Sequence, residues 1–220
     1  MSEKPILFSA PMVRALLAGT KTQTRRVVKP QFAKEAAPVE MPATDPIGGW
    51  VVGGHSGIWW CDAAANPDEA MRCPYGQPGD RLWVREAFAG SIAYERHGYP
   101  LKEWGNKIWY IADGEPRSGQ WTLPRPSIHM PRALSRITLE VTGVRVERLQ
   151  DISEADAQAE GAPSADLASG RECIFPHQGT YRWGFRLLWE QINGPGSWEA
   201  NPFVWVVEFR RLPTNQRESA

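Results

Sequence analysis

The stretch Ser9–Arg26, SAPMVRALLAGTKTQTRR, is the starting point for predicting the fold of this chain. Its first half is typical of a short helix, because Ser9 suits an N-cap and Pro11 is tolerated in a first helical turn. The apolar side chains recur at helical spacing, at Met12, Val13, Leu16 and Leu17. Gly19 suits the left-handed residue that ends many helices, so we expect the helix to stop there.

The second half of this stretch has a different character. The segment Lys21–Arg26, KTQTRR, contains three cations, two threonines and no apolar residue. Val27 and Val28 follow it and Pro30 closes it, which predicts an extended polar strand after the glycine turn. This composition is compatible with a solvated basic strand and with a strand that presents its side chains to a ligand.

The spacing of four residues in this stretch resembles a known signature. Gly19, Lys21, Thr24 and Arg26 match, in order, the pattern of the ASCH superfamily. Many ASCH proteins carry glutamate where this chain has Thr24. Threonine at that place resembles the small bacterial N4-acetylcytidine amidohydrolases, which share a K-T-x-T-x-R core.

The resemblance extends along the chain. Residues 79–84 match G-D-x-L-x-V, which is an ASCH pattern. Residues Leu149 to Glu160, which follow the strand that contains E-V-T, match the amidohydrolase spacing L-x-x-L-T-E-x-x-A-x-x-E with conservative changes. Segments also resemble prophage-encoded ASCH proteins. The resemblance implies an α+β fold, a PUA-like β-barrel with flanking helices. We expect a single domain over 1–213 with insertions at about 31–79 and 89–131, and a disordered tail at 214–220.

Hydrophobic patterns predict the remaining elements. Strands are predicted at 5–8, 81–88, 107–112, 137–149 and 203–212, and helices at 153–160 and 181–193. Ser153 suits an N-cap, with Asp156 at the third helical position as in a capping box. The segments 89–106 and 113–136 are predicted to be polar or irregular loops.

The resemblance implies a catalytic set of Lys21, Thr24 and Glu160. Amide hydrolysis needs a nucleophile, a proton carrier and stabilisation of the oxyanion. Thr24 would supply the hydroxyl, Lys21 would accept its proton if burial and neighbouring arginines lower its pKa, and Glu160 would orient the lysine or activate water. In an ideal strand Lys21 and Thr24 point to opposite faces, so their convergence requires a turn or a bulge.

Further residues are candidates for substrate binding. We expect Arg25, Arg26, Trp83 and Glu86 to line the pocket, with Glu86 bonding substrate or an arginine without being the acid–base group. The chain has 11 tryptophans, some of which could form a stacking wall for a planar base. The expected partner is therefore a small-molecule nucleoside.

Two alternatives come from other functional classes. PUA-like barrels often bind RNA, and the same cations could hold a phosphate backbone. An ASCH ribonuclease would instead use Lys21 and His129. A concentrated set of donors suited to phosphate or carboxylate supports these alternatives, although a solvated surface loop explains it equally well. These residues are Arg125, Ser127, His129, Arg132 and Arg136.

Composition bounds the remaining possibilities. The 220 residues carry 25 basic and 25 acidic side chains, so bulk charge does not require a nucleic-acid partner. No signal peptide or membrane-spanning run is evident, and we expect a cytoplasmic protein without a membrane partner. The three cysteines, with His177, could be imagined as a zinc site, but ordinary reduced cysteines are the stronger expectation. The proposed chemistry requires no metal or cofactor, and the oligomeric state is left open.

Overall fold

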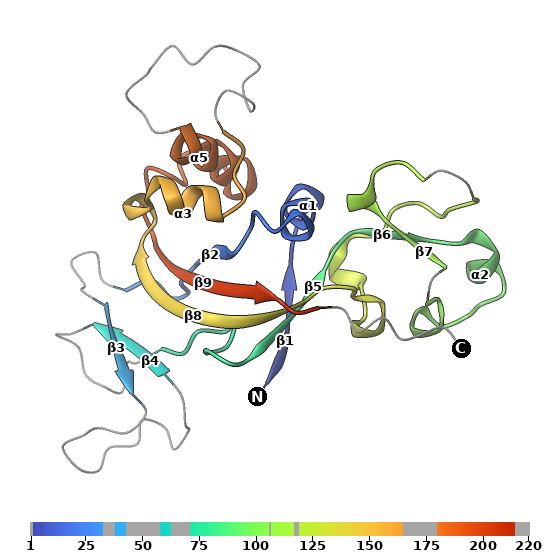
Figure 1. Cartoon of the computed structure of the whole chain (residues 1–220), viewed down its shortest axis with the longest axis horizontal. Helices are drawn as coiled ribbons and strands as arrows, with labels where there is room; N and C mark the ends of the chain where they lie inside the picture. The colour runs from blue at the N-terminus through green and yellow to red at the C-terminus, as the bar shows by residue number, and fades with distance from the viewer. Residues whose placement is uncertain are drawn as a thin grey trace. The chain divides into compact units, whose positions relative to one another are not determined.

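The computed structural model describes residues 2–32, 38–42, 58–62, 71–105, 107–116, 119–164 and 180–213. They form an α+β fold, as the sequence predicted, and the strand pairs are mostly antiparallel (Figure 1). The α-helices in this part of the chain are α1 (Ala10–Ala18), α2 (Ile92–Arg96), α3 (Glu154–Ala159) and α5 (Thr180–Asn193). The described strands do not close into a barrel, and the PUA-like barrel stays a prediction.

The chain divides into two compact units. Unit 1 comprises Met1–Gly19, Gly79–Glu140 and Arg210–Ala220, and unit 2 comprises Thr20–Pro78 and Val141–Phe209. Neither unit is one continuous segment, and the single domain over 1–213 stays a prediction. The tail at 214–220 lies outside the described residues, as do parts of both expected insertions.

Unit 1 is organised around the strand order β1-β5-β8. β1 (Glu3–Leu7) pairs in parallel with β5 (Arg81–Arg85), and β5 pairs antiparallel with the first residues of β8 (Thr138–Arg148). A separate antiparallel pair is formed by β6 (Phe88–Gly90) and β7 (Ile108–Tyr110). A core cluster lies beside this pair and consists of Phe88, Trp104, Ile108, Met130 and Leu134.

The helix predicted from the opening stretch is α1, and its ends explain its length. Ser9 occupies the N-cap, where its carbonyl accepts a hydrogen bond from Val13 N at 2.9 Å, but its hydroxyl makes no capping bond. Gly19 ends the helix at φ 76°, the left-handed conformation that glycine adopts without strain. Its buried side chains are Met12, Val13 and Leu16.

Unit 2 has the strand order β8-β9-β2, so that β8 continues from one unit into the other. β2 (Gln23–Val27) pairs antiparallel with β9 (Phe203–Arg211), while β3 (Pro38–Pro42) and β4 (Ile58–Asp62) form a separate antiparallel pair. Helices α3 and α5 pack side by side (Figure 1). Their apolar faces join the core residues Leu149, Ile152, Ala157, Ala162, Phe185, Trp189, Trp198, Val204 and Val206.

The register of β2 with β9 defines two faces of this strand pair. Residues directly opposite each other share a face, so Arg25 shares a face with Val206, which belongs to the core beneath α3 and α5. Thr24 is opposite Val207 and Arg26 is opposite Trp205, and these residues occupy the other face. We call these the helix face and the Trp205 face.

Several predicted boundaries differ from the observed ones. The strand predicted over 81–88 is two strands, β5 and β6, with Glu86 and Ala87 between them. The predicted loop over 89–106 contains α2, and the strand predicted to reach 112 ends at Tyr110. Single 3₁₀ turns account for much of the rest: η3 (Leu101–Glu103), η4 (Ile111–Asp113), η5 (Ser127–His129), η6 (Arg132–Leu134) and η7 (Leu149–Asp151).

Candidate active site

The centre of the site is a buried ion pair between Lys21 and Glu160. Lys21 Nζ donates to Glu160 Oε2 at 2.9 Å and to the Glu160 backbone carbonyl at 2.7 Å. The two side chains are 1% and 5% exposed, respectively. The backbones also form an isolated antiparallel bridge, which Thr22 N extends by donating to Ala159 O at 2.8 Å. Two positions far apart in the sequence are therefore fixed together by main chain and side chain.

The position of Glu160 at the end of α3 explains why this contact is favourable. The Ser153 hydroxyl begins the helix by accepting a hydrogen bond from Asp156 N at 3.0 Å, and Glu160 is the C-cap residue. A carboxylate is disfavoured there, because the carbonyl end of a helix carries partial negative charge. The Lys21 ammonium offsets this cost by binding the side chain and the last carbonyl together.

Arg25 joins Glu160 to two further carboxylates. Its guanidinium donates from Nε to Glu147 Oε1 at 2.9 Å and from Nη1 to Glu160 Oε1 at 3.2 Å, and it lies 3.4 Å from Asp156 Oδ2. The Phe185 ring lies 5.9 Å from Arg25 Cζ. Arg25 is 2% exposed, so it is held at the centre of the network rather than directed to solvent.

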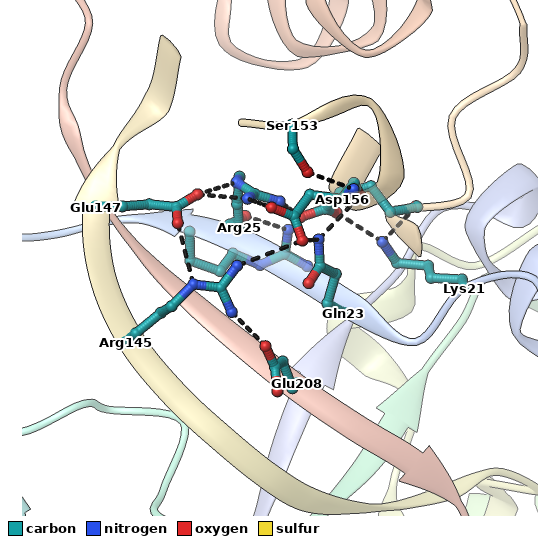
Figure 2. A network of polar contacts seen from close by, with 10 residues as sticks. Lys21, Gln23, Arg25, Arg145, Glu147, Ser153, Asp156 and Glu208 are labelled. Carbon is teal, nitrogen blue, oxygen red and sulfur yellow. Dashed lines mark hydrogen bonds and ion pairs between the residues drawn. The ribbon is translucent and has the colours of Figure 1, made fainter. Parts of the chain in front are cut away.

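The network continues along the helix face of the sheet (Figure 2). Gln23 Nε2 donates to the Asp156 carbonyl at 2.9 Å and to Asp156 Oδ1 at 3.1 Å. Arg145 donates to Glu147 Oε2 at 3.1 Å and pairs with Glu208. Within this network three cations (Lys21, Arg25 and Arg145) face four carboxylates (Glu147, Asp156, Glu160 and Glu208), so its formal charge is not positive.

Burial changes the acid–base character of Lys21. Loss of hydration disfavours the charged ammonium and lowers the pKa of Lys21 below its usual value, and the nearby charges of Arg26 and Arg25 act in the same direction. The charge and hydrogen bond of Glu160 oppose this shift without cancelling it. A lysine with a lowered pKa can accept a proton closer to neutral pH, which is what a general base requires.

The third predicted catalytic residue, Thr24, lies on the Trp205 face. It is buried and stands between Gln23 and Arg25, whose side chains bond α3 and β8 residues on the helix face. Because side chains alternate along a strand, the Thr24 side chain points away from them. The structure therefore brings Lys21 and Glu160 together and leaves Thr24 on the opposite side of β2.

A pocket of about 330 Å³ opens beside the Trp205 face. It contains Arg26, one of the predicted substrate-binding residues. The charge of Arg26 and its hydrogen bond to Tyr75 oppose a rise in the Tyr75 pKa that burial causes. The pocket is lined by Arg26, Val27, Lys29, Pro74, Tyr75, Asn193 and Trp205.

The other two predicted binding residues, Trp83 and Glu86, belong to unit 1. Glu86 is 1% exposed and accepts two hydrogen bonds from Arg136, at 2.9 and 3.0 Å. Burial raises the Glu86 pKa, and Arg136 opposes the shift. Trp83 is partly buried, with Arg85 Cζ 5.4 Å from its ring. His129 of the ribonuclease alternative is an exposed residue of η5.

Sequence reasoning missed Gln23, Arg145, Glu147 and Asp156 as members of the site. A usable signal was present, because Gln23 and Arg25 continue the alternation that begins at Lys21, and Asp156 and Glu160 are four apart on one helix face. Polar residues at strand spacing and carboxylates at helix spacing together suggest a strand docked against a helix. The pairing between them is long-range and has no local signal.

The imagined zinc site is only partly covered by the described residues. Cys73 is buried, whereas Cys173 and His177 of the imagined zinc set lie outside the described residues. No group of three or more histidine, cysteine, aspartate or glutamate side chains in the described ranges is arranged to hold a metal ion.

Comparison with protein-family models, curated proteins and solved structures finds no match for this chain. No helix within the described ranges combines the length and the apolar composition needed to cross a membrane.

Proposed function

We propose that this protein is an ASCH-type amidohydrolase that removes the acyl group from N4-acylated cytosine nucleosides, such as N4-acetylcytidine. The products are cytidine and a carboxylate. The observation that carries the proposal is the buried contact between Lys21 Nζ and Glu160 Oε2 at 2.9 Å. This contact unites two of the three residues to which the amidohydrolase resemblance assigns catalysis.

In the proposed mechanism the neutral amine of Lys21 takes the proton of the attacking hydroxyl. The hydroxyl oxygen adds to the acyl carbon, and the tetrahedral intermediate collapses with cleavage of the C–N4 bond. Lys21 returns the proton to N4, so that the amine leaves uncharged. Glu160 holds Lys21 in position, and Arg25 fixes Glu160 in turn through the bond at 3.2 Å.

The attacking hydroxyl belongs either to Thr24 or to water. Attack by Thr24 forms an acyl-enzyme that a water molecule then hydrolyses. Because Thr24 lies on the Trp205 face, this route requires the Lys21–Thr24 segment to rearrange until Thr24 Oγ reaches Lys21 Nζ. Direct attack by water requires only local opening around the buried pair, which substrate entry requires in any case.

Roles for the remaining predicted residues follow from their contacts. Arg25 bonds carboxylates throughout, so we assign it to positioning Glu160 rather than to binding the base. Arg26 is assigned to substrate binding on the acyl-enzyme route, because it shares the Trp205 face with Thr24 and lines the pocket that Tyr75 and Trp205 also line. The contacts of Trp83 and Glu86 assign them no role here, and substrate binding by these two residues stays a prediction.

Binding of an RNA backbone through the signature segment is the weaker alternative. Phosphate binding requires cations with uncompensated charge. Lys21 and Arg25 are each in contact with carboxylates, and the network they belong to contains more carboxylates than cations. This arrangement suits proton transfer or structural stability better than attraction of a polyanion.

The test measures, by chromatography, the cytidine that purified wild type and variants release from N4-acetylcytidine. We expect Lys21→Arg and Glu160→Gln to fold, as judged by circular dichroism, and to lose most of the activity, because arginine cannot release a proton at neutral pH. Lys107→Arg, a change at an exposed residue, is the matched control and should remain active. An active Lys21→Arg enzyme would rule out the lysine as proton carrier.

Thr24→Ala distinguishes the two routes. An inactive Thr24→Ala enzyme that still binds substrate supports the acyl-enzyme route. Full activity in this variant supports direct attack by water.

A further inference from the structure

Unit 1 contains a basic cavity that is separate from the Lys21–Glu160 pair and that the proposed hydrolysis does not use. Its volume is about 770 Å³, which is in the range of sites for small molecules. Four of the lining side chains are cationic and one is a carboxylate. The lining residues are Glu3, Arg81, Lys102, Gly105, Arg132, Ala133, Ser135, Arg136, Thr138, Leu212 and Pro213.

Two of the four cations are held in place by carboxylates. Arg132 donates to both Glu3 oxygens, at 2.8 and 3.1 Å, and to the Thr138 hydroxyl at 3.2 Å. Arg136 donates to both Asp113 oxygens, at 2.7 and 2.8 Å, in addition to its bonds with Glu86. These contacts give both guanidinium groups a defined orientation at the wall of the cavity.

The other two cations, Arg81 and Lys102, are less constrained. In the described part of unit 1, neither Arg81 nor Lys102 forms an ion pair. Glu140, which is opposite Arg81 in the β5–β8 register, is already bonded by Arg210 at 2.8 Å. Glu3, the partner of Arg81 in the β1–β5 register, interacts electrostatically with Arg81 but is bonded by Arg132. The four lining cations outnumber the one lining carboxylate, and an anion can engage Arg81 and Lys102 without displacing an ion pair in the described residues.

We propose that this cavity binds the phosphomonoester group of a small molecule of nucleotide size. Phosphate oxygens can accept paired hydrogen bonds from the planar guanidinium of Arg81, while Lys102 contributes a point charge. Arg132 can add a contact because Glu3, to which it is bonded, is partly exposed and exchangeable. The cations converge on one cavity rather than forming a stripe along the surface, which favours a compact ligand over a polymer.

Titration calorimetry with adenosine 5′-monophosphate and with adenosine tests the proposal. Adenine compounds are used because the proposed substrate of the hydrolase site is a cytosine nucleoside. We expect the monophosphate to bind the full chain and adenosine to bind at least about tenfold more weakly, because it lacks the charged group. The affinity for the monophosphate should also fall as salt is raised.

Variants locate the site. The double variant Arg81→Ala with Lys102→Ala should bind the monophosphate at least about tenfold more weakly than wild type. The matched control is Arg96→Ala with Lys107→Ala, which removes the same two residue types from exposed positions of unit 1 outside the cavity and should bind normally. Lys102→Ala alone, a change in an exposed 3₁₀ turn, provides a second variant with less effect on folding.

Three results would overturn the proposal. The first is equal binding of adenosine and its monophosphate, or no binding of either. The second is unchanged affinity in folded Arg81→Ala/Lys102→Ala protein. The third is tight binding of an RNA oligonucleotide without terminal phosphates when the monophosphate does not bind, which would assign the cavity to a phosphodiester backbone.

Discussion

Lys21 illustrates what burial does to a single residue. An ammonium group removed from water loses its hydration, and only contacts of good geometry compensate for that loss. Here the compensation comes from one carboxylate oxygen and one carbonyl, at 2.9 and 2.7 Å. The pKa of Lys21 nevertheless remains below its usual 10.5, because burial is the largest influence on it.

This shift gives the stability of the protein a defined dependence on pH. Between the lowered pKa of folded Lys21 and 10.5, the unfolded chain binds more protons at this position than the folded chain does. The contribution of Lys21 to the free energy of unfolding therefore increases as the pH rises through that interval. Urea unfolding at a series of alkaline pH values should show this rise in wild type and a flatter profile in Lys21→Met. A difference between the two proteins that stays constant or shrinks would contradict the assignment.

Within this network, replacing Arg25 should lower the free energy of unfolding the most. Arg25→Ala leaves Glu147, Asp156 and Glu160 with fewer positive partners in a buried setting, and breaking buried ion pairs typically costs about 3–5 kcal/mol. Arg186→Ala is the control, because Arg186 pairs with Glu199 where the side chains are 32% and 54% exposed. Its loss should cost about 1 kcal/mol or less. Chemical denaturation measures the free energy of unfolding of both variants. A loss in Arg25→Ala as small as that in Arg186→Ala would show that the Arg25 network is not stabilising.

At the scale of elements, the two serine N-caps provide an internal comparison. Ser153 accepts a hydrogen bond from Asp156 N, whereas the Ser9 hydroxyl makes no capping bond. Ser153→Ala should lower the free energy of unfolding by about 1 kcal/mol. Ser9→Ala should lower it by only about 0.3 kcal/mol. Urea midpoints of the two variants check the difference. Equal losses would mean that the hydrogen bond contributes little beyond residue preference.

The same comparison shows what the sequence could and could not predict. Gly19 and the spacing of Met12, Val13 and Leu16 placed α1 correctly, because helix periodicity and the terminating glycine are local signals. Whether the Ser9 hydroxyl makes its bond depends on side-chain geometry that no pattern encodes. The division of the strand predicted over 81–88 was also missed, since Glu86 keeps the alternation while its contact with Arg136 lies 50 residues away.

For the candidate site the limit is pairing between distant segments. Residue patterns predicted the strand after Gly19 and the short helix that ends near Glu160, while the catalytic roles of Lys21 and Glu160 came from the family resemblance. The contact between them joins residues 139 positions apart. Alternation along β2 also anticipated that Lys21 and Thr24 would diverge unless the chain bent, and β2 runs extended from Gln23 to Val27. Local rules thus described each strand and helix better than they described which side chains meet.

At the scale of the whole molecule, the chain passes from one unit to the other inside two of its strands. The boundaries after Glu140 and Phe209 fall within β8 and β9, so each of these strands has residues in both units. Unfolding of one unit would therefore disrupt a strand that also belongs to the other unit. We therefore expect one cooperative unfolding transition rather than two.

Two variants, one in each unit, test this expectation by calorimetry. In unit 1, Gly90→Ala would place a methyl group 1.6 Å from the Trp104 ring in the core, an overlap that should cost about 3 kcal/mol or more. In unit 2, Arg25→Ala weakens the carboxylate network. If β8 and β9 couple the units, each variant lowers the melting temperature of the same single transition. Two resolved transitions, with each variant moving only one of them, would show that the units unfold independently despite the strands they share.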